Sequence, residues 1–205
     1  MIRFRACLVA SITVAATAAG AAPLSAQAPA APAAAEYGRA MKLDTQVFES
    51  ANKQIRLEYP KRDWEIVPRA GATMIPGVTS PIVSLVHRRR EAAVVIEQTK
   101  LHQPLALDDI TDLFGQLEVD SVRERQPQAS DVKAKLVEAG GRRFVIVTYA
   151  RQGVSGPERV RQYSIPAGAD LFRLTCVAAA SQFAKYEPIF AHVAASFTVT
   201  AGGTQ

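Results

Sequence analysis

Apolar and polar residues alternate with a period of two in several short segments after residue 54. Ile55, Leu57 and Tyr59 alternate with charged residues, which predicts a half-buried strand that ends at Pro60. The same kind of pattern, with enrichment in β-branched and aromatic residues, predicts seven further strands. They span residues 64–67, 82–87, 93–101, 132–139, 142–151, 158–165 and 171–179.

Turn-forming residues join these strands into hairpins. A Gly-Gly pair at 140–141 and a Pro-Ala-Gly sequence at 166–168 are typical hairpin connections. A charged tip at 88–91 joins another pair of strands. Residues 144–149 are mostly apolar on both faces, which predicts a central strand covered on two sides.

One helix is predicted between the hairpins, from its three- and four-residue apolar spacing. Carboxylates crowd its first turns, where negative charge interacts favourably with the helix dipole, and the helix should stop before Pro127. The apolar residues are Leu107, Ile110, Phe114 and Leu117, and the carboxylates are Asp108, Asp109 and Asp112.

A second helix is predicted to close the chain, with Ser181 as its N-cap. Because proline is tolerated only near the first turn, the regular part of this helix is expected to begin at Pro188. A short helix is also expected over residues 44–52, with Val47 and Phe48 as its apolar contacts. The stripe of the closing helix consists of Phe183, Tyr186, Ile189, Phe190, Val193 and Phe197.

Antiparallel hairpins interrupted by one helix and closed by another predict an α+β fold, a mainly antiparallel sheet flanked by helices. The composition agrees with a packed globular domain, since 48% of the 205 residues are hydrophobic and 21% are charged.

Residues 1–26 have the pattern of a signal peptide. Two arginines precede an apolar run rich in small residues, which is shorter than the roughly 20 residues of a membrane-spanning helix. This favours cleavage over an uncleaved anchor. The cut is expected after Ala26, and a cut after Ala28 is the alternative.

An Ala/Pro-rich linker is predicted for residues 27–44 and the folded domain for residues 45–200. We therefore expect a soluble protein exported to the periplasm, with no stable membrane anchor. The chain is compatible with a monomer.

The charge of the exported chain is mild. Without Arg3 and Arg5, which belong to the signal, 22 basic residues face 19 acidic ones, so the formal net charge falls from +5 to +3. Nucleic-acid-binding proteins concentrate positive charge far more strongly, so nucleic acid is not an expected partner.

The order of elements resembles the PsbP-like superfamily. The likeness rests on the strand 55–59 running into Pro60 and then Trp64, on the strand 171–178, and on 183–190 followed by Ser196-Phe197. This superfamily includes lumenal subunits of photosystem II, a Ran-binding nuclear import factor and many exported bacterial proteins. The resemblance implies an α/β/α sandwich and a non-catalytic binding or assembly module. It carries over no metal or chloride site and no partner.

Groups that could support catalysis are few. The three histidines are His87, His102 and His192, and their spacing is not that of a metal site. His87 and His102 could approach one another across a hairpin. An interpretation as ordinary surface histidines is nevertheless favoured over a shared site. Cys176 lies mid-strand, where a thiol packs as a small apolar group, and an exposed thiol could instead form an intermolecular disulfide.

The three aspartates named above are explained by the helix dipole better than by a cation site. No catalytic residue, cofactor or metal is therefore predicted.

Arg88, Arg89 and Arg90 are the candidate partner contact. Exposed arginines can bind carboxylates or phosphates in bidentate fashion, although a solvated tip that keeps the sheet soluble explains them better. Other basic residues that could join them are Lys61, Arg62, Arg142 and Arg143.

The sequence thus predicts an exported non-catalytic module that binds an unknown protein or envelope component through this tip and the loop 69–81. The first alternative is a periplasmic carrier of a small apolar or anionic ligand, held between sheet and helix. The second is a hydrolytic enzyme with an unrecognised site.

Overall fold

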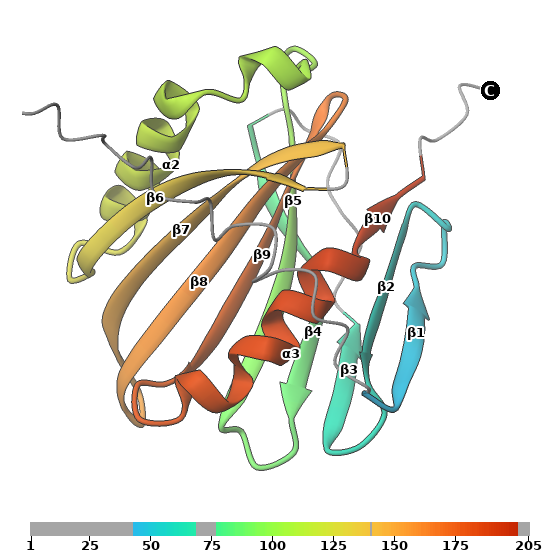
Figure 1. Cartoon of the computed structure of the whole chain (residues 1–205), viewed down its shortest axis with the longest axis vertical. Coiled ribbons are helices and arrows are strands. Elements are labelled where there is room, and N and C mark those ends of the chain that lie inside the picture. The colour runs from blue at the N-terminus through green and yellow to red at the C-terminus, as the bar shows by residue number, and fades with distance from the viewer. Residues whose placement is uncertain (1–42, 69–76, 140, 201–205) are drawn as a thin grey trace, which may run out of the picture. The chain divides into compact units, whose positions relative to one another are not determined.

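The computed structural model describes residues 43–68, 77–139 and 141–200. The predicted signal peptide, the linker up to residue 42 and residues 69–76 of the predicted loop lie outside these ranges. The described residues contain two antiparallel sheets (Figure 1), one with the strand order β3-β4-β5-β9-β8-β7-β6 and one with the order β1-β2-β10. The predicted α+β class is confirmed.

The strands are β1 (Thr45–Glu49), β2 (Ile55–Pro60), β3 (Trp64–Pro68), β4 (Thr79–His87), β5 (Ala92–Lys100), β6 (Ser130–Ala139), β7 (Arg142–Gly153), β8 (Gly156–Ala167), β9 (Asp170–Ala179) and β10 (Thr198–Val199). The helices are the 3-10 turn η1 (Leu107–Asp109), α2 (Asp112–Arg125) and α3 (Phe183–Ser196). All eight strands predicted from the sequence are present.

Tight turns fix the register between neighbouring strands. Gly153 faces Gly156 across the β7–β8 turn, and the φ of Gly156 is +120°, which residues with a side chain rarely adopt. From this turn the ladder runs without interruption, so Thr148 faces Arg161. Because facing residues share a face of the sheet, the turn also decides which side chains meet further along the strands.

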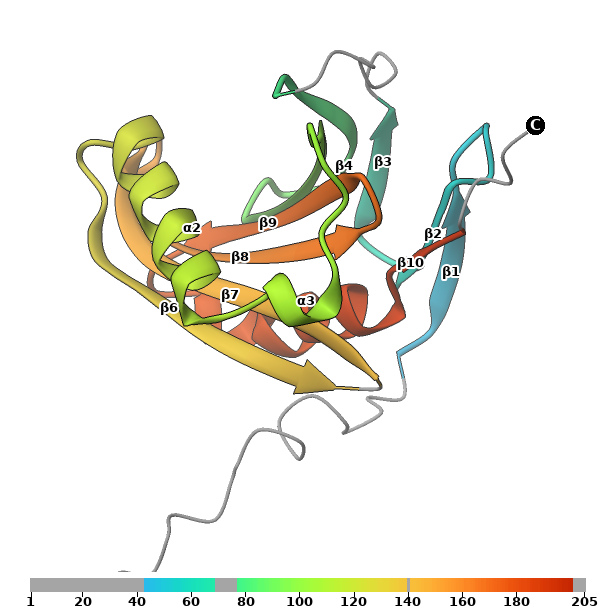
Figure 2. The same cartoon turned by 90° about the horizontal axis from the view of Figure 1, so that it is seen from above.

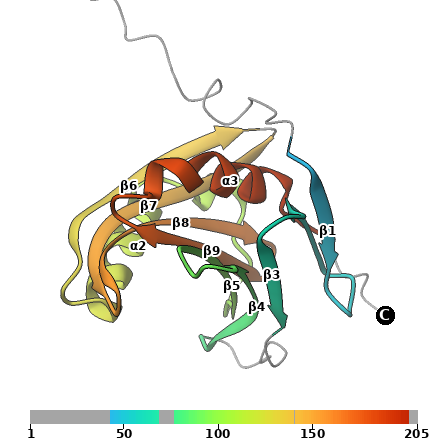
Figure 3. The same ribbon diagram turned by 90° about the horizontal axis from the view of Figure 1, so that it is seen from below.

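Each face of the seven-stranded sheet has its own apolar cluster. α3 covers one face and packs β2 on its own other side, and α2 covers the second face above β6 and β7 (Figures 2 and 3). Strand β7 serves both faces: Phe144 and Ile146 join the α3 side, whereas Val145 and Val147 join the α2 side. This confirms the prediction of a strand covered on two sides.

The prediction of a helix over residues 44–52 is wrong, because residues 45–49 of this segment form the strand β1. A helix of nine residues is marginal in water by itself. As a strand, the segment pairs with β2 along its whole length and packs Phe48 against the core.

The helix predicted from residue 107 is interrupted. η1 ends at Asp109, and α2 begins at Asp112 after the N-cap Thr111; its end before Pro127 is confirmed. The predicted apolar face is wrong in one position, since Leu117 is 58% exposed while its neighbour Glu118 is only 3% exposed.

α3 starts before the proline and not at it. Its N-cap is Gln182, not Ser181, and it makes no side-chain capping bond. Pro188 is the sixth residue of the helix, so the prediction that the regular part begins there is wrong. The apolar stripe is confirmed, with five of its members buried and Ile189 packed against the same cluster.

A buried ion pair holds α2 on the sheet. Arg173 on β9 donates two hydrogen bonds to the Glu118 carboxylate, at 3.0 Å from Nε and 2.7 Å from Nη2. Ser164 and Gln162 on β8 donate to the same carboxylate at 2.5 and 3.0 Å. Burial alone would raise the pKa of Glu118, but Arg173 and Ser164 outweigh that effect and lower it below its ordinary value.

The large sheet ends in two different edge strands. β3 is five residues long and ends in Pro68, which has no N–H to offer a further strand. β6 is ten residues long, carries Lys133 and Lys135, and has a register irregularity where Asp131 adopts a φ of +54°.

We expect Glu118→Ala to lower the free energy of unfolding by about 3–5 kcal/mol, because it leaves the guanidinium of Arg173 buried without its counter-charge. Urea unfolding at neutral pH measures the change. Glu118→Leu combined with Arg173→Leu should be less damaging than the sum of the two single changes.

The pH dependence provides the control. Since the folded protein lowers the pKa of Glu118, its contribution is complete above the ordinary value of 4.5 and is lost as the pH falls through the lowered pKa. Glu118→Gln should therefore destabilise the protein less at acid pH than at neutral pH. An equal loss at both pH values would contradict the role given to this ion pair.

Candidate functional site

Two charged turns lie side by side at one end of the sheet. The backbone N–H of Arg88 donates to the carbonyl of Asp63 at 2.8 Å, and this bond joins the β4–β5 turn to the β2–β3 turn. The result is a cluster of five exposed basic residues, here called the basic tip: Lys61, Arg62, Arg88, Arg89 and Arg90.

Little of the positive charge at the basic tip is neutralised. Arg88 lies 3.3 Å from the Glu65 carboxylate, with both side chains about 60% exposed. An exposed ion pair of this kind contributes little to stability, so Arg88 can leave Glu65 for another anion at small cost. Within the described residues, Arg89 and Arg90 form no ion pair. Two guanidinium groups are therefore free to bind an anionic partner.

Aromatic packing fixes the base of the basic tip. The ring of His87, the residue before Arg88, lies 5.7 Å from the Trp64 ring and 5.3 Å from the Tyr186 ring of α3. His87 is buried, so the expectation of a surface histidine is wrong for it. The three rings connect β3, β4 and α3 directly beneath the turn.

Glu91 makes a second connection between the turn and α3. The hydroxyl of Tyr186 donates to the Glu91 carboxylate, and Nζ of Lys185 lies 3.3 Å from it. These hydrogen bonds lower the pKa of Glu91, that of Tyr186 having the larger effect. Glu91, the fourth residue of the 88–91 turn, is thus already paired with α3. The three arginines before it remain exposed to solvent.

A groove of about 520 Å³ runs beside the basic tip, between the β4–β5 turn, the β7–β8 turn and β3. We call it the docking groove. Its sides include Glu65, Arg88, Arg90 and Glu158. Glu158 is paired with Arg151 at 2.8 Å.

The floor of the docking groove is an apolar row across three strands. Val86 faces Ala93, and Ala93 faces Val177, so the three side chains share the face that α2 covers elsewhere. α2 packs on β6 and β7, at the far end of this face (Figure 2). Val67 of β3 adds a further apolar side chain, which is 38% exposed.

The other basic residues suggested by the sequence do not join this site. Arg142 donates to the carbonyls of Ala195 and Phe197 at the end of α3, at 3.0 and 2.6 Å. Arg143 pairs with Glu138 at 2.5 Å. Both arginines lie at the opposite end of the sheet and have structural partners there.

The histidines are not brought together. His87 adjoins the β4–β5 turn, whereas His102 follows the far end of β5, about 30 Å away along a nine-residue strand. His192 on α3 lies 3.4 Å from the Glu58 carboxylate.

The aspartates have local roles. The Asp109 carboxylate accepts the N–H of Ala106 at 2.7 Å, and Asp112 is the first residue of α2. In the described parts of the chain, no three side chains of His, Cys, Asp or Glu are grouped as metal ligands would be.

Cys176 is fully buried on β9. Burial raises the pKa of its thiol far above the ordinary value, so the reactive thiolate is strongly disfavoured. This environment gives neither a nucleophile nor a thiol that could reach a second chain.

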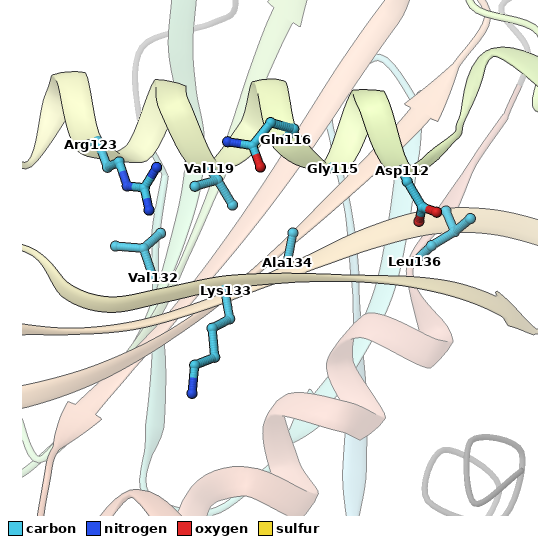
Figure 4. A pocket seen from close by; sticks show the side chains of 9 residues that line it. All are labelled: Asp112, Gly115, Gln116, Val119, Arg123, Val132, Lys133, Ala134 and Leu136. Carbon is cyan, nitrogen blue, oxygen red and sulfur yellow. The ribbon is translucent and has the colours of Figure 1, made fainter. Parts of the chain in front are cut away.

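A further pocket of about 330 Å³ lies between α2 and β6 (Figure 4). Gly115 lets the two elements approach closely, because a Cβ at this position would already lie 3.5 Å from the Cβ of Ala134. The polar side chains of its lining are Asp112, Gln116 and Arg123 of α2 and Lys133 of β6; all four are solvent-exposed, and Lys133 points away from the helix (Figure 4). We see no convergent set of polar groups there.

No helix in the described ranges combines the length and apolar character that a membrane crossing requires. No family model matches the chain, and no curated protein matches it in sequence.

Similar folds are found among solved structures. Cyanobacterial PsbP (CyanoP) from Synechocystis sp. PCC 6803 superposes with a TM-score of 0.58 at 17% identity, over 80% of this chain and 96% of that protein. LpqN, described as involved in cell envelope biogenesis of Mycobacterium tuberculosis, superposes with a TM-score of 0.53 at 16% identity, over 81% of this chain and 96% of LpqN. At this level of identity the likeness concerns the fold, and the chain has the PsbP-like fold that the family resemblance implies.

Proposed function

We propose that this protein is a non-catalytic binding or assembly module that docks a partner at the basic tip and the docking groove. The observation that carries the proposal is the position of Arg88 and Arg90 on the side of a groove with an apolar floor. A rigid base of three packed rings supports this edge, so little ordering is needed when a partner binds.

The chemistry of the site favours one kind of partner. Free guanidinium groups bind carboxylates, and the row of Val86, Ala93 and Val177 accepts an apolar side chain. We therefore propose a protein partner that presents acidic residues beside an apolar anchor. The predicted contact loop 69–81 stays a proposal, because residues 69–76 lie outside the described ranges and residues 79–81 belong to β4.

The two alternatives have unequal support. A carrier needs a pocket between sheet and helix, and a pocket of about 450 Å³ lined by residues of β6, β7, β8 and α3 meets this requirement. A hydrolytic enzyme needs an accessible nucleophile with a nearby base, and the buried thiol of Cys176 does not provide one.

We also propose that the protein is exported, on the basis of the charged start and apolar run of residues 1–22. In a bacterial host that expresses the full chain, N-terminal sequencing of the periplasmic fraction should find a form that starts at residue 27 or 29. A full-length protein that stays with the membranes would contradict export.

Charge reversal at the basic tip tests the docking proposal. A photo-crosslinker at position 67, in the groove, should form a discrete adduct with a partner in cells, and a crosslinker at Leu113 on α2 should not. Replacement of Arg88, Arg89 and Arg90 by glutamate should reduce the adduct at least tenfold, and added salt should weaken it in the unmodified protein.

The matched control reverses three other exposed cations, Lys53, Arg56 and Arg123, which lie away from the groove. This control should keep the adduct. If both triple variants lose the adduct equally, general surface charge explains the capture, and the proposal of a docking site at the basic tip is wrong.

In protein without residues 1–26, which contain Cys7, the thiol of Cys176 should resist a water-soluble maleimide when folded and react fully in denaturant, because its side chain has no exposed surface. Mass spectrometry of the labelled protein measures this. Rapid labelling of the folded protein would revive the alternatives of a nucleophilic thiol and of an intermolecular disulfide.

A further inference from the structure

The pocket of about 450 Å³ lies at one corner of the large sheet, and we call it the corner pocket. The residues that line it come from the first halves of β6, β8 and α3 and from the second half of β7. Three cationic side chains line it: Lys133, Arg159 and Arg161. None of them belongs to the basic tip or to the docking groove.

Strand register brings these cations to the same face. Lys133 faces Thr148, and Thr148 faces Arg161, so the three form one row across β6, β7 and β8. Facing residues in such a row have Cβ atoms about 5 Å apart. Arg159 precedes Arg161 by two residues and therefore points to the same side, about 7 Å further along the strand. Figure 4 shows Lys133 directed away from α2, to the side of β6 that faces α3.

Arg161 forms a rigid wall of the corner pocket. It is ion-paired with Glu187 of α3, its guanidinium lies 5.8 Å from the centre of the Phe183 ring, and its side chain is 17% exposed. These contacts hold the guanidinium in place before any ligand arrives.

The other two cations are free to bind. Lys133 and Arg159 are exposed and form no ion pair with any described residue. The carboxylate of Glu187 is already occupied by Arg161. Asp131, in the irregular part of β6, is the remaining carboxylate that lines the pocket.

We infer that the corner pocket binds the phosphate group of a small phosphate monoester. A dianion of this kind matches two unpaired cations, one of them a planar guanidinium that can donate two parallel hydrogen bonds. The hydroxyl of Thr148, between the strands that carry them, can donate a further bond to a phosphate oxygen. The volume is within the range of about 300–1,000 Å³ that is typical of small-molecule sites.

This site is independent of the docking groove, and it would give the carrier alternative its ligand. The same phosphate chemistry is present in a soluble metabolite and in a lipid headgroup. The experiment therefore needs one arm for each source.

Calorimetric titration of the protein with inorganic phosphate and with glycerol 3-phosphate, at constant ionic strength, tests the soluble source. We expect saturable binding that Lys133→Gln combined with Arg159→Gln weakens at least tenfold. Asp131→Asn should strengthen it severalfold, because it removes a negative charge from the same pocket. Vesicles of phosphatidylcholine with and without phosphatidic acid test the lipid source.

The control removes the same charge elsewhere, through Arg56→Gln combined with Arg123→Gln, and should bind as the unmodified protein does. Charge reversal at the basic tip should also leave phosphate binding unchanged, which separates this site from the docking groove. Binding only to phosphatidic acid vesicles, with the same dependence on Lys133 and Arg159, would support the proposal with a lipid headgroup as the source. Absence of saturable binding in both arms, or an equal loss in the control pair, would overturn it.

Discussion

The seven-stranded sheet has apolar side chains on both faces, and each face must be covered separately. β7 makes this constraint plain, because its alternate residues join two different clusters. α3 covers one face and carries the small sheet against it, and α2 covers the other. Neither cover extends over the whole sheet. The docking groove lies beyond the reach of α2, and the corner pocket lies where α3 begins, so both candidate sites follow from the limited length of two 14-residue helices.

The strands were predictable because their signals are local: alternation within each strand and turn residues between them. The errors arise where distant partners decide. The segment 45–49 forms a strand because all five of its residues pair with β2. The residues of the segment itself do not show that this partner is present. The burial of Glu118 in place of Leu117 depends on Arg173, which is 55 residues away in sequence. The spacing of apolar residues alone cannot identify the buried face of a helix when a carboxylate on that face makes the contact.

The candidate sites show the same division. Three consecutive arginines identify the basic tip in the sequence, but only the pairing of β3 with β4 shows that Lys61 and Arg62 join it. The corner pocket was missed because its cations lie on two different strands and belong to no motif. One signal was available, since the short turn between Gly153 and Gly156 fixes the pairing of Thr148 with Arg161.

The two edges of the large sheet differ in how they are protected. A short strand ending in proline closes one side, while two lysines and an irregular ladder protect the ten-residue strand on the other. Such features discourage a second molecule from adding its own strand. The large sheet would thereby resist fibril-like stacking, and its contacts with other molecules would be made by side chains rather than by backbone.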